Sequence, residues 1–292
     1  MSVTPNVYES NVPIDLTGQV ALVTGGGRGL GRVFAQALAA VGAAVAVAAR
    51  SEHQLAETVS LIKAKNGQAI AVPFDVTDES ALERAEAIIQ SRLGPVDLLV
   101  NNAGMWGPIN PVWETDPEEW WRTMEVHVRG SFLCARAVLP GMIARQKGRI
   151  VNVVSNAGVF RWPTCSAYSV SKAALIKFTE NLAAETKRQG VAVFAVNPGI
   201  TTIGLTELAM NMEDSTESHA GRAAAWIRQV VEEGRAVQPE QGAQLIVSLA
   251  TGGADMLTGR YLSVDDDLGA LVARGDEINR EDLYTLRLRE SI

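Results

Sequence analysis

A tyrosine and a lysine four residues apart are the first candidates for chemistry in this chain. Tyr168 and Lys172 stand in the run YSVSK, within a segment predicted to be a helix that ends near Gln189. Residues four apart lie on one face of a helix, so the phenol and the ammonium should be neighbours. A nearby cation lowers a tyrosine pKa from its ordinary value of about 10. Such a tyrosine can act as a general acid or base near neutral pH.

A serine supports this interpretation, because a YxxxK pair by itself often arises by chance. Ser155 follows a predicted strand over residues 148–154. Ligands of open α/β sheets bind beyond the carboxyl ends of the strands, so its hydroxyl would hold a substrate oxygen beside Tyr168. The run NNAG at 101–104 follows another predicted strand at the same edge. Small residues there would let a cofactor lie close, and an ordinary turn is the alternative.

The glycine-rich run TGGGRGLG at 24–31 follows the first predicted strand and opens a helix. Glycines let the backbone approach a pyrophosphate closely, and the helix N-terminus supplies free N–H groups and a positive dipole end. A glycine cluster alone is a weak signal, because many strand-to-helix turns contain glycine. The strand before it and the helix after it indicate a dinucleotide site.

The end of the second predicted strand favours NADP over NAD. An NAD site usually has an acidic residue there, which binds the ribose hydroxyls. Here the strand ends in Arg50 and Ser51 instead. Arg50 can bind a 2′-phosphate through charge-assisted hydrogen bonds, and Arg28 in the glycine turn is a second cation close by. The alternative is that both arginines are simply solvated.

Apolar strand-like runs alternate with helical patterns along the chain. This order predicts an α/β fold of Rossmann type, with a doubly wound parallel sheet and right-handed crossovers. The runs are mostly continuous, as expected for strands covered on both faces. Ser51 and Asp116 are predicted to begin two of the helices. The predicted strands are 19–24, 44–49, 68–74, 96–100, 148–154, 191–197 and 260–264.

The order of elements predicts one catalytic domain over 17–264, between an N-terminal extension over 1–16 and a C-terminal extension over 265–292. Within the domain, 200–237 is predicted to be a substrate-loop insertion. Its apolar residues have helical spacing, so it is either a small packed helix pair or a lid over the substrate. The C-terminal extension is expected to pack on a neighbouring subunit.

Composition excludes several other classes. The net charge of −7 argues against a nucleic-acid surface. No apolar run reaches the ~20 residues that a membrane span needs, and we expect no signal peptide. The two cysteines suggest neither a disulfide framework nor a metal site. The expected location is the cytoplasm.

Taken in this order, the motifs make the chain resemble the short-chain dehydrogenase/reductase (SDR) family, over about residues 16–264. Besides those already given, the resemblance includes Asp75 in FDVTD and the run NPG at 197–199. It implies that Asp75 and Val76 hold the adenine, and that Lys172 also binds the nicotinamide ribose. Family members are usually dimers or tetramers, packed partly through the helix that carries the tyrosine. The resemblance and the motifs together predict these cofactor-binding residues: Gly25, Arg28, Gly29, Leu30, Gly31, Arg50, Ser51, Asp75, Val76, Asn102, Ala103, Gly104, Tyr168, Lys172, Pro198, Gly199, Ile200 and Thr202.

The sequence departs from the family pattern at several positions. His127 stands where the family has a catalytic asparagine that helps hold a proton-relaying water. His127 would support that water, weaken the relay, or be simply structural. Ile203 replaces a threonine that touches the carboxamide, for which Thr201 or Thr202 would substitute. Three aspartates at 265–267 replace the usual Asp-Gly-Gly, and a solvated turn is expected there rather than a metal site.

The sequence therefore predicts an NADP(H)-dependent oxidoreductase that moves a hydride between nicotinamide and a small carbonyl or alcohol substrate. Ser155, Tyr168, Lys172 and His127 are the predicted catalytic residues, and a homodimer or homotetramer is the expected assembly. Trp106, Trp162, Cys165 and the loop after Gly199 are expected to shape an apolar pocket for a bulky or aromatic substrate. The alternatives are an NAD-dependent alcohol dehydrogenase of the same fold and a non-catalytic dinucleotide sensor.

Overall fold

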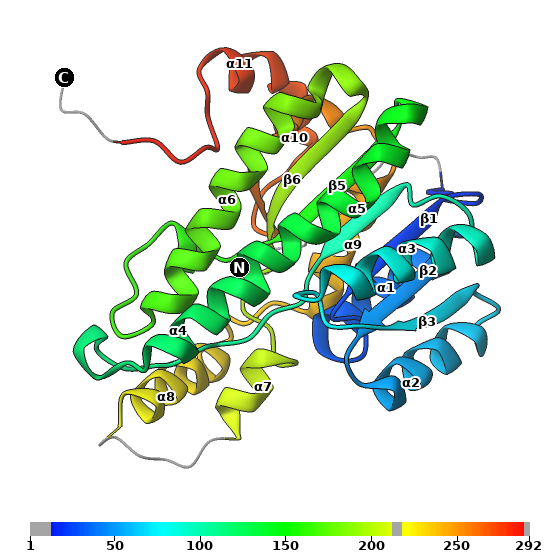
Figure 1. Cartoon of the computed structure of the whole chain (residues 1–292). Coiled ribbons are helices and arrows are strands. Elements are labelled where there is room, and N and C mark those ends of the chain that lie inside the picture. The colour runs from blue at the N-terminus through cyan, green and yellow to red at the C-terminus, as the bar shows by residue number, and fades with distance from the viewer. Residues whose placement is uncertain (1–12, 212–217, 289–292) are drawn as a thin grey trace.

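A seven-stranded parallel sheet organises the fold, and the structure, a computed structural model, describes residues 13–211 and 218–288. The strand order is β3-β2-β1-β4-β5-β6-β7 (Figure 1). It reverses between β1 and β4, and ligands of such sheets bind at this switch point. The strands are β1 (Val20–Thr24), β2 (Ala44–Ala49), β3 (Ala69–Pro73), β4 (Leu98–Asn101), β5 (Gly148–Val153), β6 (Val191–Asn197) and β7 (Tyr261–Ser263).

The predicted fold class is confirmed, since every predicted strand is present with small differences at its ends. The predicted helix starts are also confirmed: Ser51 Oγ accepts from the Gln54 N–H, and Asp116 Oδ1 accepts from the Glu119 N–H. Most of the predicted N-terminal extension lies outside the described residues. The helices are α1 (Gly29–Ala40), α2 (Glu52–Lys63), α3 (Glu79–Arg92), α4 (Pro117–Met124), α5 (Gly130–Arg145), α6 (Ser166–Thr186), α7 (Leu205–Met210), α8 (His219–Glu232), α9 (Pro239–Ala250), α10 (Leu268–Ala273) and α11 (Gly275–Arg280).

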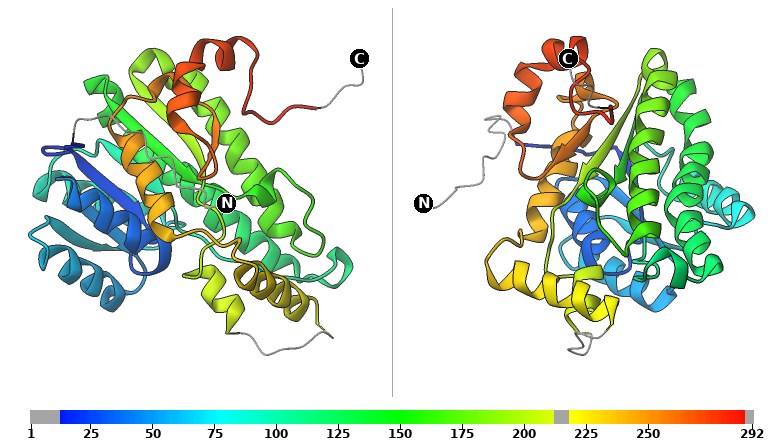
Figure 2. Two further views of the ribbon diagram at one scale, coloured as in Figure 1. Left: turned by 180° about the vertical axis from the view of Figure 1, so that it is seen from behind. Right: turned by 90° about the vertical axis from the view of Figure 1, so that its left-hand side faces the viewer.

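Helices cover both faces of the sheet, which explains the continuous apolar strands. One core lies under α1, α2 and α9, where Phe34, Leu55 and Ile246 are fully buried. The other lies under α3, α5 and α6, where Ile89 and Met142 are fully buried. Figure 2 shows the sheet between these two layers. Its two buried faces hold the carboxyl ends of the strands in fixed positions.

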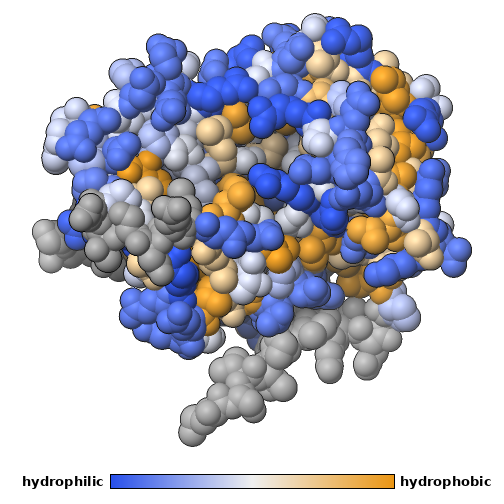
Figure 3. All heavy atoms as spheres, turned by 90° about the horizontal axis from the view of Figure 1, so that it is seen from below, coloured by the Kyte–Doolittle hydropathy of each residue, from blue (hydrophilic) through white to orange (hydrophobic). Residues whose placement is uncertain are grey.

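The segment predicted as a substrate-loop insertion forms a helix pair between β6 and α9. Ala209 of α7 packs with Ala224 and Ile227 of α8. Figure 1 shows this pair at one end of the molecule, with α10 and α11 at the opposite end. Seen from the side of α7 and α8, the surface has several apolar patches among polar residues (Figure 3). Residues 212–217, which connect the two helices, lie outside the described part.

The C-terminal extension packs on its own chain, and the expected packing on a neighbouring subunit stays a prediction. Leu268 and Leu271 of α10 and Ile278 of α11 are buried in the same core as α9. The Tyr261 N–H of β7 donates to the Tyr284 carbonyl at 2.8 Å, so the tail pairs with the outer edge of the last strand.

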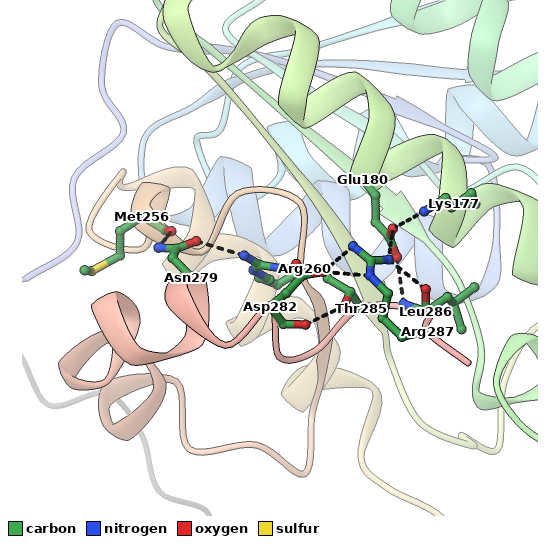
Figure 4. A network of polar contacts seen from close by, with 9 residues as sticks. All are labelled: Lys177, Glu180, Met256, Arg260, Asn279, Asp282, Thr285, Leu286 and Arg287. Atoms are coloured by element: carbon green, nitrogen blue, oxygen red, sulfur yellow. Dashed lines mark hydrogen bonds and ion pairs between the residues drawn. The ribbon is translucent and has the colours of Figure 1, made fainter. Parts of the chain in front are cut away.

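Ion pairs fasten the end of this extension to α6 and β7 (Figure 4). Glu180 of α6 accepts from the Leu286 N–H and from the Arg287 guanidinium, both at 2.7 Å. Arg260, beside β7, donates to Asp282 at 2.7 Å. The tail is therefore attached to the helix that carries the predicted catalytic pair. No helix in the described ranges is long and apolar enough to cross a membrane.

Candidate active site

A cavity of about 1310 Å³ lies beyond the carboxyl ends of the strands. It exceeds the ~300–1,000 Å³ typical of a site for one small ligand, so it has room for a dinucleotide and a substrate together. His127 and Thr202 are not among its lining residues. The other predicted site residues all line it: Gly25, Arg28, Gly29, Leu30, Gly31, Arg50, Ser51, Asp75, Val76, Asn102, Ala103, Gly104, Ser155, Tyr168, Lys172, Pro198, Gly199 and Ile200.

The turn between β1 and α1 is shaped by its glycines. A Cβ on Gly31 would lie 2.3 Å from the Gly25 carbonyl oxygen and 2.5 Å from Asn102 Nδ2. Gly25 and Gly29 adopt positive φ angles of 65° and 54°. Arg28, at the N-cap of α1, makes no side-chain capping bond, so the first N–H groups of the helix stay open to an anion. This cradle fits the pyrophosphate of a dinucleotide.

The substrate loop lies directly against this turn. A Cβ on Gly29 would lie 2.8 Å from the Gly204 Cα, and a Cβ on Gly204 would lie 3.8 Å from the Leu30 nitrogen. Both glycines have positive φ angles. Backbone therefore meets backbone where the loop before α7 crosses the start of α1.

The far end of the cavity carries positive charge. Arg50, at the end of β2, exposes 76% of its side chain and lies 3.9 Å from Asp75. Ser51 caps α2, and Arg28 is an exposed residue that lines the same cavity. No acidic residue follows β2 directly, as the sequence indicated.

Arg122 of α4 is a cavity residue that the sequence reasoning missed. Its guanidinium donates to Asp75 at 3.1 Å and lines the same end of the cavity. Burial opposes ionisation of Asp75, but hydrogen bonds from Thr77 and the cations Arg122 and Arg50 outweigh it and lower the Asp75 pKa. Asp75 is thus held as a carboxylate. No local motif marks Arg122, because its partner lies 47 positions away.

Tyr168 and Lys172 lie on one face of α6, as predicted, and both are buried. The Lys172 ammonium lies 5.5 Å from the centre of the Tyr168 ring and donates to the Val153 carbonyl at 2.9 Å. Ser155 comes two residues after Val153, beyond the end of β5, and accepts from the Ala157 N–H. The strand β5 and the helix α6 therefore bring the three polar groups into one cavity.

Burial is the main cause of the pKa shifts of Tyr168 and Lys172. It raises the pKa of Tyr168 to about 12, although a hydrogen bond with Ser155 acts in the opposite direction. It lowers the pKa of Lys172 to about 8. The expected lowering of this pKa relied on two cations, Lys172 and the nicotinamide, and it stays a prediction for the protein with its cofactor bound. A group with a pKa near 12 is protonated at neutral pH.

His127 lies beneath the cavity rather than in it. It stands in a five-residue π-helical turn, Glu125–Arg129, between α4 and α5. Its Nε2 accepts from the Met105 N–H at 2.9 Å, and its Nδ1 lies 2.7 Å from Ser171 Oγ. Burial, then the charge of Lys172, lower its pKa well below 6.5. His127 is therefore a buried, neutral side chain with a hydrogen bond at each of its ring nitrogens.

Aromatic rings line the cavity next to Tyr168. The Trp106 ring lies 5.1 Å from the Tyr168 ring and 5.5 Å from that of Trp162, measured between centres. Trp226 of α8 lies 5.6 Å from Trp162. The expectation that tryptophans shape the pocket is supported by their positions, whereas Cys165 is buried and is not a lining residue.

The start of the substrate loop differs from the prediction in one residue. Thr201 is buried and lines the cavity, whereas Thr202 is exposed and does not. The positive φ of Gly199 turns the chain so that the next two residues face the cavity. Ile203 also lines it, in the place where the family has threonine.

The fold and the site together define a dinucleotide-binding α/β oxidoreductase with a tyrosine–lysine pair. The family model described as short chain dehydrogenase matches residues 19–216. A short chain dehydrogenase of Pseudocercospora fijiensis is 36% identical, over 97% of this chain and 94% of that protein. The chain therefore belongs to the short-chain dehydrogenase family, whose members bind a nicotinamide dinucleotide.

Two further relatives have named reactions. A 3-oxoacyl-[acyl-carrier-protein] reductase of Synechocystis is 36% identical, over 86% of this chain and 96% of that protein. The crystal structure of a single-substitution variant of actinorhodin polyketide ketoreductase with NADPH has a TM-score of 0.77 at 34% identity, covering 86% of this chain and 97% of that one. Both similarities extend over most of each chain.

Proposed function

We propose that this protein is an NADP-dependent oxidoreductase that transfers a hydride between nicotinamide and a carbonyl or alcohol substrate. The observation that carries the proposal is the convergence of Ser155, Tyr168 and Lys172 on the cavity that the glycine turn also lines. A dinucleotide bound at the glycine turn and a substrate in the same cavity would therefore share it with these three groups. The names of the relatives support reduction of a carbonyl, because two of them are reductases.

The cofactor is held along the whole length of the cavity. The turn Gly25–Gly31 takes the pyrophosphate, Asp75 and Val76 take the adenine, and Lys172 takes the nicotinamide ribose. Arg50, Ser51 and Arg28 take the 2′-phosphate. The remaining predicted contacts are Asn102, Ala103, Gly104, Pro198, Gly199 and Ile200, with Thr201 in place of Thr202 at the carboxamide. The bound cofactor supplies the hydride acceptor or donor at C4 of its ring, and a positive charge when oxidised.

Tyr168 is the general acid in the reduction direction. Its raised pKa keeps the phenol protonated at neutral pH, so the proton donor is present when the substrate binds. Ser155 and Tyr168 hold the carbonyl oxygen, and Tyr168 passes its proton to that oxygen as negative charge develops. In the oxidation direction the same tyrosine takes the proton back as a base, which Lys172 and the positive charge of an oxidised nicotinamide would favour by lowering its pKa.

The preference for NADP rests on charge at the end of β2. Arg50 and Arg28 are exposed at the cavity, and no carboxylate stands there to bind a free ribose 2′-hydroxyl. The cytoplasm is the proposed location. A homodimer or homotetramer is the proposed assembly, supported by Phe132 of α5 and Val170 of α6, which are 47% and 44% exposed.

A cofactor titration tests the proposal. Purified protein is titrated with NADPH and NADH, and a panel of carbonyl compounds is then followed at 340 nm. We expect tighter binding of NADPH and its oxidation by at least one carbonyl. Tyr168→Phe should keep the cofactor affinity and lose at least ~100-fold in turnover. Tighter binding of NADH would overturn the NADP assignment. Binding without turnover on any carbonyl or alcohol would favour a sensor.

A further inference from the structure

The part of the cavity beyond Tyr168 is lined by aromatic rings in edge-to-face contact and by the cation Arg161. Trp106, Trp162 and Trp226 form an aromatic wall, in which the ring centres lie 5.5 Å and 5.6 Å from one to the next. The wall begins at Tyr168, whose ring centre is 5.1 Å from that of Trp106. It ends at Trp226, which is 40% exposed at the mouth of the cavity. An aromatic body packed against these rings would have one end at the phenol and the other near solvent.

The tryptophans are held in place by different elements, so the wall is a built surface. Trp106 Nε1 donates to the Leu205 carbonyl at 2.8 Å, which ties the segment after β4 to the start of α7. Trp162 comes from the loop before α6, and Trp226 comes from α8. Because three separate segments supply the rings, their alignment is set by the tertiary fold rather than by one helix periodicity.

Arg161 is the cation of this region. It adjoins Trp162, lines the cavity and is exposed. Within residues 13–211 and 218–288 it has no hydrogen bond, ion pair or ring contact. Of the other lining cations, Arg28, Arg50 and Arg122 lie at the adenine end, and Lys172 lies beside Tyr168, where it donates to the Val153 carbonyl. The one lining carboxylate of the described ranges, Asp75, also lies there and is already paired with Arg122. Among these residues Arg161 thus has no counter-charge in the cavity.

We infer that the substrate is an aromatic carbonyl compound that carries one acidic group. The reacting carbonyl lies at Ser155 and Tyr168, the aromatic body lies along the wall, and the acidic group binds Arg161. A cation beside a partly enclosed apolar wall binds an anion through charge-assisted hydrogen bonds. Arg161 is therefore a specificity-determining residue. The reaction at the carbonyl rests on the proposed function, whereas the binding of the acidic group by Arg161 rests on the cavity alone.

Equilibrium binding tests the inference without turnover. 2-Naphthoate and 2-naphthamide have the same two-ring body and differ in charge, so each is titrated by calorimetry into the full chain with saturating NADPH, and again without cofactor. We expect naphthoate to bind about tenfold more tightly than naphthamide. Arg161→Gln should remove that tenfold preference and leave the naphthamide affinity unchanged, and Arg161→Glu should reverse it. Arg188→Gln, which removes an exposed charge at the far end of α6, is the matched control.

The wall is tested separately with Trp226→Leu. We expect this substitution to weaken both ligands by a similar factor, because it removes ring contact and no charge. Trp113→Leu is its control, since Trp113 is 84% exposed and does not line the cavity. Equal affinity of wild type for the two ligands, or a preference that survives Arg161→Gln, would overturn the role of Arg161. Failure of both ligands to bind would overturn the aromatic class.

The two proposals fail in different ways. If neither NADPH nor NADH binds, the proposed function falls, while the titrations without cofactor still decide the role of Arg161. If NADPH binds and carbonyl compounds are reduced with no preference for charged over neutral aryl ketones, the proposed function stands and this inference falls.

Discussion

His127 Nδ1 lies 2.7 Å from Ser171 Oγ, and both side chains are buried. Because Nε2 accepts from the Met105 N–H, the proton of the neutral ring is assigned to Nδ1 and donated to Ser171. Ser171 in turn donates to the Tyr168 carbonyl at 2.7 Å. His127 therefore joins the segment after β4 to the helix of the catalytic pair, and it acts as a positioning residue.

The first prediction follows from its lowered pKa. Free histidine titrates near 6.5, and the folded protein holds His127 neutral well below that. Between these values the unfolded chain binds the proton and the folded chain does not, so stability falls as the pH decreases below 6.5. We expect the free energy of unfolding of wild type to fall more steeply than that of His127→Asn, by up to ~1.4 kcal/mol per pH unit.

Urea unfolding between about pH 6.5 and 5.0 measures this difference. His53→Asn is the control, because the His53 side chain is 83% exposed. Parallel pH profiles for wild type and His127→Asn would show that His127 is not held neutral by its surroundings.

The second prediction concerns the buried ammonium of Lys172. Its pKa is about 8 in the folded protein, whereas a free lysine has a pKa of 10.5, so the charged form destabilises the fold at pH 7. The difference between the two pKa values corresponds to about 3 kcal/mol. We expect Lys172→Met to be more stable than wild type at pH 7 by up to about this amount, and inactive.

The stability advantage of Lys172→Met over wild type should depend on pH in one direction. From about pH 8 to 10.5 the folded protein loses the Lys172 proton before the unfolded chain does, so wild type gains stability as the pH rises. The advantage of Lys172→Met should therefore shrink across this range. Other titrating groups contribute equally to both proteins, so they cancel when the two free energies of unfolding are subtracted. A constant difference across the range would contradict the prediction.

The third prediction concerns cofactor choice. Arg50→Glu places a carboxylate at the end of β2, where it repels a 2′-phosphate and accepts hydrogen bonds from a free ribose. We expect NADPH affinity to fall about 10–100-fold, and NADH affinity to rise. Fluorescence titration of each cofactor measures both. Arg92→Glu, at the exposed end of α3, has the same charge change away from the cavity and should bind like wild type.

The fourth prediction concerns the glycine turn. Gly31→Ala would place a methyl group 2.3 Å from the Gly25 oxygen, so the turn must open. We expect a loss of about 1–3 kcal/mol in the free energy of unfolding and weaker binding of both dinucleotides. Gly253→Ala is a matched control, because the nearest atom to its added methyl lies 3.6 Å away. Unchanged cofactor affinity in Gly31→Ala would separate this turn from dinucleotide binding.

The sequence predicted what depends on local pattern. Strands, helix caps and the glycine turn each leave a signal within a few residues, and the lysine four positions after Tyr168 fixes their common face. Arg161 had a weak signal of this kind, because it adjoins Trp162, which was already expected at the pocket.

The rest depended on tertiary contacts. Arg122 and Asp75 are 47 positions apart in the sequence, and no local pattern around either residue predicts that they form an ion pair. The placement of Thr201 rather than Thr202 depends on how the chain turns at Gly199. The rise that burial causes in the Tyr168 pKa of the protein without cofactor was not foreseen, because the extent of burial cannot be read from a four-residue spacing.

The pairing of the Tyr261 N–H with the Tyr284 carbonyl has a consequence for the solution behaviour of the protein. An uncovered outer strand is a template on which strands of other molecules can add, and proteins avoid aggregation by covering it. Here the chain covers that strand with its own tail, which Glu180 and Arg260 hold down through ion pairs. A chain shortened before residue 282 would leave the Tyr261 N–H without this partner, and we expect that strand to be open to pairing with other molecules.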